Sequence, residues 1–400
     1  MKCCVLGLGY IGLPTAAVLA NAGHKVLGID INEKIISSLL NSEVHIKEPG
    51  LSEIVLEKLR TKAIKVSKDI EPSDVFLITV PTPFKKSKKS DIPCPDISYI
   101  TEAVTSISKE LKKGNLIILE STSPVGTTEK IAEIIFKKTG FDSNDIHIAY
   151  CPERVIPGNI LYELVENDRV IGGYTPQASE KARNFYQTFC KGRLDTTSTK
   201  VAEMVKLSEN TFRDINIAYA NELSIICDKL NINELEVIKF ANKHPRVNIL
   251  NPGCGVGGHC IAVDPWFIAS QFPEETKLIQ ASRNVNLTKT KWVVNSIIKK
   301  SIELKKKFNK EIVIGLMGLA FKPNVDDLRE SPAYFIAKEL VRLDMKILGY
   351  EPNIENCQDI KLSNLSKINK DVDLAVFLVA HKEFFNLQIN VEMMDFCGIF

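Results

Sequence analysis

The feature that most constrains the fold is a glycine pattern near the start of the chain. The apolar run Cys3–Leu6 leads into Gly7-Leu8-Gly9-Tyr10-Ile11-Gly12, and helical periodicity follows over Pro14–Ala22. In a strand–turn–helix unit of this kind, the first glycine permits a tight turn and the second lets the backbone approach a pyrophosphate. The third lets helix and strand pack closely, while the helix N-terminus faces the anion. The pattern therefore predicts a dinucleotide site at the edge of a parallel sheet.

Acidic and hydroxyl residues at the ends of apolar runs indicate which dinucleotide binds. Asp30 closes the run Val26–Asp30. A carboxylate at this place accepts hydrogen bonds from ribose hydroxyls and repels a 2′-phosphate, so we expect NAD rather than NADP. Thr82 and Thr122 follow later runs, where strand ends meet a cofactor in open α/β sheets. Their spacing fits turn-forming hydroxyls equally well.

Strand and helix signals alternate through the first half of the chain. This rhythm predicts a parallel sheet with helices on both faces. The segment from Val201 to Leu230 contains neither Gly nor Pro and indicates one long helix, and another helix is expected over Ser282–Lys307. Strand signals then return and predict a second, smaller α/β domain. The expected strands are Cys3–Leu6, Lys25–Ile29, Val75–Val80, Leu116–Leu119, Ile146–Tyr150, Ile312–Leu316, Met345–Leu348 and Leu374–Val379.

Composition excludes several classes of protein. The 400 residues carry a formal net charge of +2, which gives no electrostatic reason to expect nucleic acid or an anionic membrane as a partner. No apolar run reaches the roughly 18 residues that indicate a membrane span. No signal peptide is expected from the first residues, and the ten cysteines are scattered without paired spacing. These features predict a reduced, cytoplasmic protein.

Cys260 is a candidate nucleophile. It ends the glycine-rich run Gly253–Cys260, and Asp264 follows four residues later, where it can orient a base or water if the segment is helical. Single cysteines are commonly structural, but the preceding glycines let backbone N–H groups approach a ligand closely. A zinc site built from Cys254, His259 and Cys260 lacks a second ligand pair at suitable spacing, so no metal is expected.

A polar stripe on the long predicted helix is a second candidate. Lys206, Asn210 and Arg213 lie at i, i+4 and i+7 and therefore share one helix face. They suit an oxyanion and a phosphate, although most stripes of this kind are solvated. Arg154 and Arg246 lie in proline-containing segments and are candidates for phosphate contacts, because arginine makes bidentate pairs with such groups.

A dinucleotide fingerprint combined with a thiol points to one kind of chemistry. Hydride transfer from an alcohol gives an aldehyde, and a thiol can trap the aldehyde and permit a second hydride transfer. An alcohol-to-acid dehydrogenase is therefore the leading hypothesis. A β-hydroxyacid dehydrogenase would share the fingerprint and a lysine four residues before an asparagine, but it needs no thiol. A non-catalytic NAD-responsive protein would need neither Cys260 nor Lys206.

The chain resembles the nucleotide-sugar 6-dehydrogenases, the UDP-glucose dehydrogenase superfamily, over nearly its full length. The motifs that carry the resemblance occur in the order seen in that family. They are Gly7–Pro14 (GLGYIGLP), Cys151–Gly158 (CPERVIPG), Lys206–Asn210 (KLSEN), Gly257–Cys260 (GGHC), Phe321–Pro323 (FKP) and Arg329–Pro332 (RESP).

The resemblance implies an α/β fold of three domains and a homodimer or higher homo-oligomer. The domains would be an NAD-binding Rossmann domain over 1–198, a central helical dimerisation and catalytic domain over 199–300, and a smaller Rossmann-like UDP-binding domain over 301–400. The implied reaction is oxidation of a UDP-sugar at C6, with NAD as cofactor. His244–Phe267 and the CPERVIPG motif resemble the members that act on UDP-N-acetyl-D-mannosamine, with UDP-N-acetylglucosamine and UDP-glucose as alternatives. UDP-glucose enzymes carry a second acidic residue where this chain has Pro157, which argues against glucose.

The resemblance also implies roles for individual residues. Cys260 would be the nucleophile, Lys206 and Asn210 would stabilise an oxyanion, Asp264 would assist base chemistry and Glu153 would act in thioester hydrolysis. Arg246 would reach across a dimer. The implied NAD contacts are Gly7, Gly9, Tyr10, Ile11, Gly12, Asp30, Thr82, Thr122 and Arg329. The implied substrate contacts are Arg154, Val155, Lys206, Asn210, Arg213, His244, Arg246, Gly257, Phe321 and Lys322.

Overall fold

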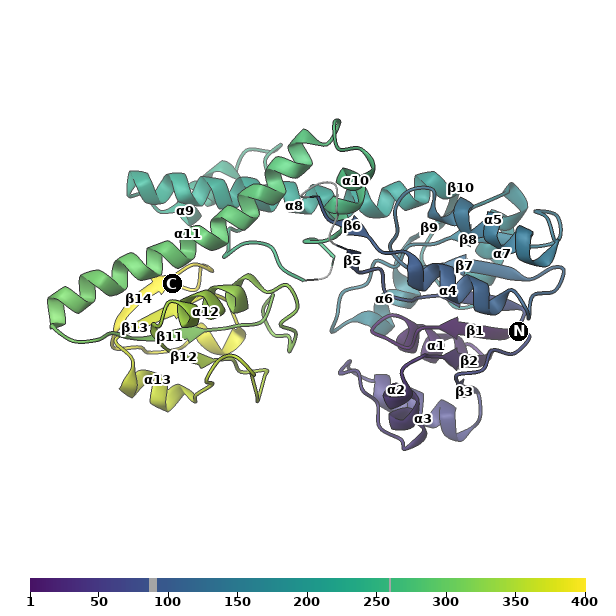
Figure 1. Cartoon of the computed structure of the whole chain (residues 1–400), viewed down its shortest axis with the longest axis horizontal. Coiled ribbons are helices and arrows are strands. Elements are labelled where there is room, and N and C mark those ends of the chain that lie inside the picture. The colour runs from purple at the N-terminus through teal and green to yellow at the C-terminus, as the bar shows by residue number, and fades with distance from the viewer. Residues whose placement is uncertain (86–91, 259) are drawn as a thin grey trace. The chain divides into compact units, whose positions relative to one another are not determined.

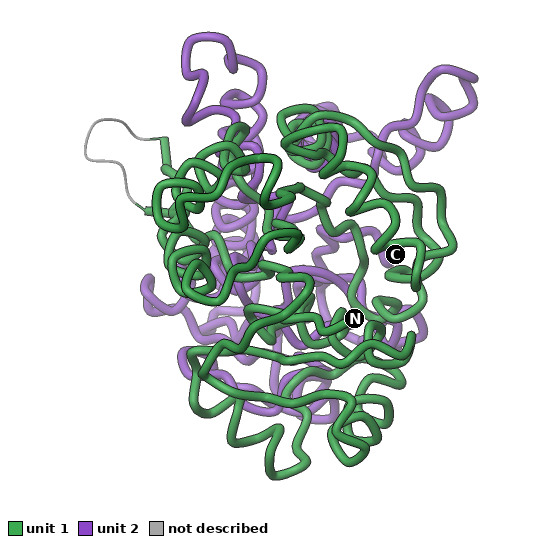
Figure 2. Tube along the Cα trace, turned by 90° about the vertical axis from the view of Figure 1, so that its right-hand side faces the viewer, with its two compact units in different colours: residues 1–208 green, residues 209–400 purple. Residues whose placement is uncertain are grey.

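The computed structural model describes residues 1–85, 92–258 and 260–400, which form two compact units, Met1–Ser208 and Glu209–Phe400 (Figure 2). Most of the lysine-rich Lys85–Lys89 segment and His259, one of the three residues weighed as zinc ligands, lie outside the described residues.

The first unit is built on an eight-stranded sheet (Figure 1). Its strand order is β10-β9-β8-β7-β4-β1-β2-β3, and every neighbouring pair is parallel except β8 and β9. The strands are β1 (Lys2–Leu6), β2 (Lys25–Ile29), β3 (Ile64–Ser67), β4 (Val75–Ile78), β7 (Leu116–Leu119), β8 (His147–Tyr150), β9 (Arg169–Gly173) and β10 (Leu194–Ser198). A short antiparallel pair, β5 (Phe84–Lys85) and β6 (Cys94–Pro95), lies outside this sheet.

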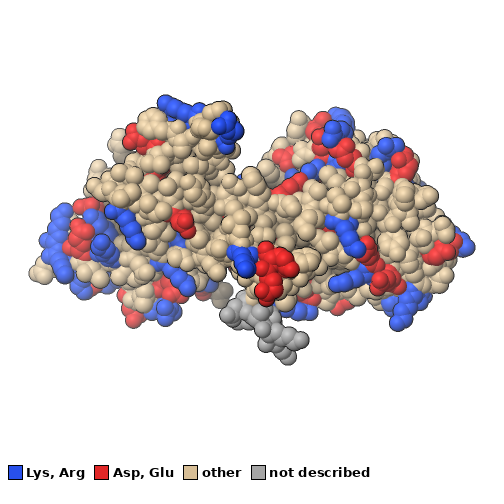
Figure 3. All heavy atoms as spheres, turned by 90° about the horizontal axis from the view of Figure 1, so that it is seen from above, with Lys and Arg blue, Asp and Glu red and all other residues tan. Residues whose placement is uncertain are grey.

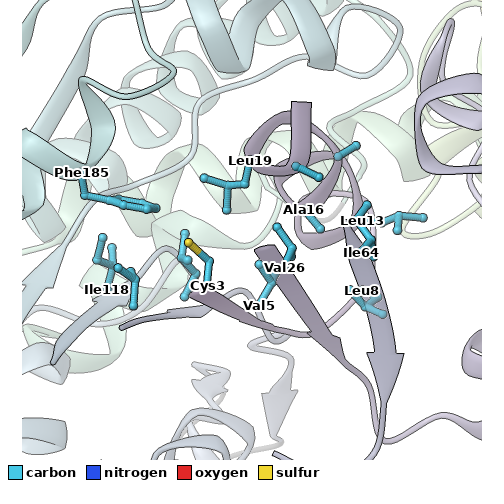
Figure 4. Packing of buried hydrophobic residues seen from close by; sticks show 14 of the residues in the cluster. Cys3, Val5, Leu8, Leu13, Ala16, Leu19, Val26, Ile64, Ile118 and Phe185 are labelled. Carbon is cyan, nitrogen blue, oxygen red and sulfur yellow. The ribbon is translucent and has the colours of Figure 1, made fainter. Parts of the chain in front are cut away.

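Helices cover both faces of this sheet, so its central strands are apolar throughout. In β1, Cys3 and Val5 belong to one buried cluster, while Cys4 and Leu6 belong to another. Successive strand residues point to opposite faces, which explains the continuous apolar run in the sequence. Figure 4 shows the first cluster, where α1 packs on the sheet. The helices are α1 (Gly12–Asn21), α2 (Glu33–Leu40), α3 (Leu51–Arg60), α4 (Ser98–Ile107), α5 (Thr127–Thr139), α6 (Ile160–Glu166) and α7 (Pro176–Tyr186).

The second unit combines long helices with a smaller sheet. Helix α8 (Thr199–Leu230) begins in the first unit and continues into the second. The sheet has the order β12-β11-β13-β14, and all its pairs are parallel. The other elements are α9 (Glu234–Ala241), α10 (Asp264–Gln271), α11 (Lys277–Phe308), β11 (Val313–Met317), α12 (Pro332–Arg342), β12 (Lys346–Tyr350), α13 (Leu365–Asp371), β13 (Leu374–Phe377), the 3-10 helix η1 (Lys382–Phe384) and β14 (Glu392–Asp395).

The sequence predicted the α/β fold class with two sheets and the long helices correctly, and it missed strands. The missed strands are β3, β9, β10 and β14 and the two-residue strands β5 and β6. Of these, β3, β10 and β14 lie at the edges of the two larger sheets, and β9 lies next to an edge. Edge strands keep polar residues on their exposed side, so β10 reads Leu-Asp-Thr-Thr-Ser and gives no apolar run. The expectation of a parallel sheet is wrong for one pair, because β9 runs antiparallel to β8.

Charged residues of both signs, which are present in nearly equal numbers in the sequence, are mixed on the surface (Figure 3). On the face drawn in Figure 3, lysines and arginines alternate with acidic residues instead of forming a field of one sign. Among the residues that the structure describes, no helix is both long and apolar enough to cross a bilayer.

Candidate active site

The loop after β1 contains three glycines. The conformation and packing of the chain itself require two of them but not the third. Gly7 has a φ of +92°, and a Cβ on Gly12 would lie 1.7 Å from the carbonyl oxygen of Gly7. A Cβ on Gly9 would meet no described atom within 4 Å. Packing therefore explains Gly7 and Gly12 but not Gly9. An open approach to the backbone at the N-terminus of α1 fits the pyrophosphate of NAD.

Asp30 lies beside this loop. Its Oδ2 accepts a hydrogen bond from the Leu8 N–H at 2.8 Å, and its Oδ1 accepts from the Asn32 N–H at 2.8 Å. These bonds fix the carboxylate at the end of β2, where ribose hydroxyls are expected. Tyr10 is exposed and Ile11 is half-buried at the start of α1.

Thr82 and Thr122 lie in the loops after two neighbouring strands and are hydrogen-bonded to each other. The Thr82 hydroxyl donates to the Thr122 carbonyl oxygen at 2.7 Å, so it joins the loops that follow β4 and β7. Both residues are half-buried on the carboxyl edge of the sheet. That edge also carries Asp30, which places the cofactor candidates of the first unit along one side.

Lys206 and Glu153 meet in the first unit. Lys206 is only 9% exposed, and its Nζ donates to the Glu153 carbonyl oxygen at 2.8 Å. The Glu153 carboxylate is also buried, and its Oε1 accepts from the Arg154 N–H at 2.6 Å. A cation and a carboxylate are thus held next to each other, and the lysine ammonium is hydrogen-bonded to the backbone carbonyl of Glu153 instead of its carboxylate.

Glu203 anchors the start of α8 and was not predicted. Its buried carboxylate accepts from the Gly126 N–H at 2.6 Å, the Thr128 N–H at 2.8 Å and the Thr128 hydroxyl at 2.7 Å. Burial raises the pKa of Glu203 against these hydrogen bonds. Because Glu203 lies one turn before Lys206, it fixes the position of the lysine. In the sequence it looks like an ordinary charged helix residue.

Glu48 anchors the segment that follows Glu153. Its buried side chain accepts from the Gly158 N–H at 2.8 Å and the Ile160 N–H at 2.7 Å. The two bonds hold the end of the CPERVIPG segment, in which Arg154 and Val155 are half-buried. No local pattern could have identified Glu48, because its partners are over one hundred residues away in the chain.

In the second unit, Cys260 and Asp264 form one turn. The Cys260 carbonyl oxygen accepts from the Asp264 N–H at 2.8 Å, so Asp264 begins α10 one turn after the half-buried Cys260. The Asn210 side chain donates from Nδ2 to Asp264 Oδ2 at 2.5 Å. The structure therefore links Asn210 to the Cys260 segment through a buried carboxylate.

Phe321 and Lys322 lie against the glycine run. A Cβ on Gly258 would lie 2.8 Å from the Phe321 ring, and a Cβ on Gly257 would lie 2.5 Å from the Glu330 carbonyl oxygen. These glycines therefore admit the chain's own residues, a reason that the sequence did not suggest. Partial burial lowers the pKa of Lys322, and the Arg213 charge lowers it further while Cys260 opposes this shift. Lys322, Arg213 and Cys260 are thus within electrostatic range of one another.

Three other candidates lie at the surface of the second unit. His244 and Arg246 are exposed in the turn after α9, where the Arg246 N–H donates to His244 Nδ1 at 3.3 Å. Arg329, also exposed, makes a two-point pair with the Asp327 carboxylate, with Nη2 at 2.7 Å and Nε at 3.0 Å. Arg329 belongs to a different unit from the other NAD candidates.

Behind Glu153 lies a buried polar cluster that the sequence analysis also missed. The Tyr186 hydroxyl donates to Glu120 Oε1 at 2.6 Å, and Arg169 Nη1 donates to Glu153 Oε2 at 3.3 Å. Burial raises the pKa of Glu120 to about 7, although the Arg169 charge opposes this rise. The cluster places an arginine and a second carboxyl group, that of Glu120, in the interior next to the catalytic candidate Glu153.

Comparison with known proteins decides the family. Residues 1–190, 200–288 and 315–395 match the NAD binding, central and UDP binding domains of the UDP-glucose/GDP-mannose dehydrogenase family. The chain belongs to this family. It is an NAD-dependent UDP-sugar dehydrogenase, and NAD is the cofactor to which the glycine loop and Asp30 are suited.

Individual relatives extend over the whole chain. A UDP-N-acetyl-D-mannosamine dehydrogenase of Campylobacter jejuni is 49% identical, with 99% of each chain covered. An NDP-N-acetyl-D-galactosaminuronic acid dehydrogenase of Ralstonia nicotianae is 46% identical over 96% of this chain and 92% of its own. The solved structure of a UDP-N-acetyl-mannosamine dehydrogenase from Staphylococcus aureus is 43% identical and superposes with a TM-score of 0.88, covering 100% of this chain and 95% of its own.

Two alanine substitutions in the glycine loop should have opposite consequences. Gly12→Ala should lower the free energy of unfolding by about 3 kcal/mol or more, because the new methyl group overlaps the Gly7 carbonyl. Gly9→Ala should leave it within about 0.5 kcal/mol but weaken NAD binding at least ~10-fold. Urea unfolding and NAD titration measure the two effects. Unweakened NAD binding in folded Gly9→Ala would contradict the assignment of this loop.

Glu120→Gln should make stability less dependent on pH. The folded-state pKa of Glu120, about 7, lies above the ordinary value of 4.5 for a glutamate, so the folded protein holds a proton that the unfolded chain releases. Stability from this group is present below the lower value and is lost as the pH rises through 7. When the pH is raised from about 5.5 to 8.5, the free energy of unfolding of Glu120→Gln should therefore increase by about 2 kcal/mol relative to that of the parent enzyme. Urea unfolding at both pH values measures this, and an equal difference at both would contradict the raised pKa.

Proposed function

We propose that the enzyme oxidises the C6 alcohol of UDP-N-acetyl-D-mannosamine to the uronate, through a thioester on Cys260. The observation that carries the proposal is the pair of constellations on α8: Lys206 bound to the Glu153 backbone, and Asn210 bound to the Asp264 of the Cys260 turn. Lys206 and Asn210 are one helical turn apart, so they share one face of α8. The names of the Campylobacter and Staphylococcus relatives favour the N-acetylmannosamine sugar.

The covalent steps belong to Cys260. NAD, when bound, accepts the two hydrides that conversion of an alcohol to an acid releases, one for each molecule of NAD. Between the two transfers, the Cys260 sulfur adds to the aldehyde carbon and gives a thiohemiacetal. Loss of the second hydride leaves the thioester. Water then adds to its carbonyl carbon, the C–S bond breaks, and the thiolate returns with release of the acid.

Charge stabilisation belongs to Lys206 and Asn210. An oxygen gains negative charge when the thiol adds and again when water adds. Donors held in place beforehand stabilise such charge, and one donor typically contributes about 3–4 kcal/mol. Lys206 is held by the Glu153 carbonyl and Asn210 by Asp264, so neither must reorganise during the reaction. Asp264 also fixes the turn that carries the nucleophile.

Glu153 is the proposed general base for hydrolysis. Its carboxylate is buried and hydrogen-bonded, and these contacts hold it in one orientation. A general base of this type typically raises the reaction rate about 100- to 10,000-fold.

The proposed substrate contacts are Arg154, Val155, Arg213, His244, Gly257, Phe321 and Lys322, with Arg246 contributed across a homodimer. The proposed domain boundaries are 1–198, 199–300 and 301–400.

The closest competing substrate differs only in sugar stereochemistry. The Ralstonia relative is named for an N-acetylgalactosamine-derived acid, and its identity to this chain is nearly as high. A panel of UDP-sugars should separate the two. UDP-N-acetyl-D-mannosamine should give the highest kcat/KM and two NADH for each sugar consumed, measured by absorbance and product analysis. A ratio of one NADH would contradict the four-electron scheme, and preference for another epimer would reassign the substrate.

Cys260→Ser should lose uronate formation while still binding the sugar nucleotide. Serine keeps the size of the side chain but is a much weaker nucleophile, so kcat should fall at least ~1,000-fold with little change in substrate Kd. Cys357→Ser is the matched control, because Cys357 is another half-buried thiol of the same unit, and it should retain activity. Substantial uronate formation by Cys260→Ser would rule out the thioester.

A further inference from the structure

Arg169 lies directly behind the carboxylate of Glu153. It is the first residue of β9, and its side chain is 4% exposed. Its Nη1 donates to Glu153 Oε2 at 3.3 Å, and its Nη2 donates to the Leu164 carbonyl oxygen at 3.0 Å. The Glu153 side chain is 8% exposed, so both members of the ion pair are taken out of water. In such surroundings the pair is sensitive to loss of either partner.

Two aromatic rings hold the guanidinium in place. It stacks over the Tyr186 ring, with the carbon of the guanidinium 4.8 Å from the ring centre, and Phe189 lies on it at 5.9 Å. Tyr186 is itself fixed by the hydrogen bond from its hydroxyl to Glu120. An arginine braced in this way presents its N–H group to Glu153 from one direction.

Glu153 is thus fixed at both of its carboxylate oxygens and at its carbonyl. Arg169 donates to Oε2, the Arg154 N–H donates to Oε1, and Lys206 donates to the carbonyl oxygen. Each carboxylate oxygen accepts one of these bonds and retains a further lone pair for a water molecule. The arrangement orients the carboxylate and leaves it able to accept a proton.

We propose that Arg169 is a positioning residue for thioester hydrolysis, which acts by orienting the Glu153 carboxylate toward the attacking water. The inference rests on the proposed function, because it needs the thioester on Cys260. In the step concerned, Glu153 takes a proton from water, the water oxygen bonds to the thioester carbon, and the C–S bond breaks with the electron pair leaving on sulfur. The hydride transfers precede this step and do not use Arg169.

Arg169→Lys tests the proposal in the full-length enzyme. Lysine keeps the charge but lacks the planar guanidinium, whose two Nη groups donate to Glu153 and to the Leu164 carbonyl oxygen at the same time. The initial burst of NADH should remain within about 2-fold of the parent rate, while steady-state turnover falls at least ~10-fold, since a small misplacement of a catalytic group can cost about 100-fold. Acid quenching should then trap the sugar acyl group on Cys260. Arg193→Lys, which changes an exposed ion pair of the same unit, should behave as the parent enzyme.

Three comparisons decide the outcome. A double variant, Glu153→Gln with Arg169→Lys, should be no slower than Glu153→Gln alone, because both changes affect one step. If burst and steady-state rates of Arg169→Lys fall together, or if the two substitutions add, Arg169 supports only the fold and the inference is wrong. If no variant, Glu153→Gln included, ever carries an acyl group, the thioester of the proposed function fails instead. Thermal unfolding of each variant shows that the folded enzyme is being compared.

Discussion

The candidate site depends on the hydrogen bond from Lys206 to the Glu153 carbonyl oxygen. A buried ammonium group needs a partner, and here the partner is backbone of the segment that follows β8. The bond therefore joins the start of α8 to the catalytic carboxylate candidate. Glu203, one turn earlier in the same helix, accepts three hydrogen bonds from the loop before α5 and from its first turn. Both constraints fix Lys206 before any substrate is present.

Two glycine-rich segments serve different purposes in this enzyme. In the loop after β1, Gly9 leaves open space beside the backbone, which fits an external phosphate group. In the run before Cys260, the space above Gly257 and Gly258 is filled by Glu330 and Phe321 of the same chain. The first segment is thus open to a ligand, and the second brings the segment of the proposed nucleophile against substrate-binding candidates. Sequence alone does not separate these uses, since both show as clustered glycines.

Local sequence patterns predicted the elements whose residues are buried throughout or follow one clear periodicity. The buried strands and the two long helices were predicted from periodicity, and Thr82 and Thr122 were each predicted to lie at a strand end. Edge strands such as β10 were missed because their residues are mostly polar. The supporting residues Glu48, Glu203 and Arg169 were missed for another reason. Glu48 and Glu203 bond to segments distant in sequence. For all three, a charged residue shows its burial only in the folded chain.

The central claim is that the sulfur of Cys260 forms a covalent bond to the sugar during turnover. It is tested most directly by mass spectrometry of peptides from enzyme quenched in acid during turnover, with UDP-N-acetyl-D-mannosamine labelled at C6. The account predicts that the labelled acyl group is found on the peptide that contains Cys260 and that it disappears as the uronate forms. Full conversion to uronate, with the label never found on this peptide at any time point, would contradict it.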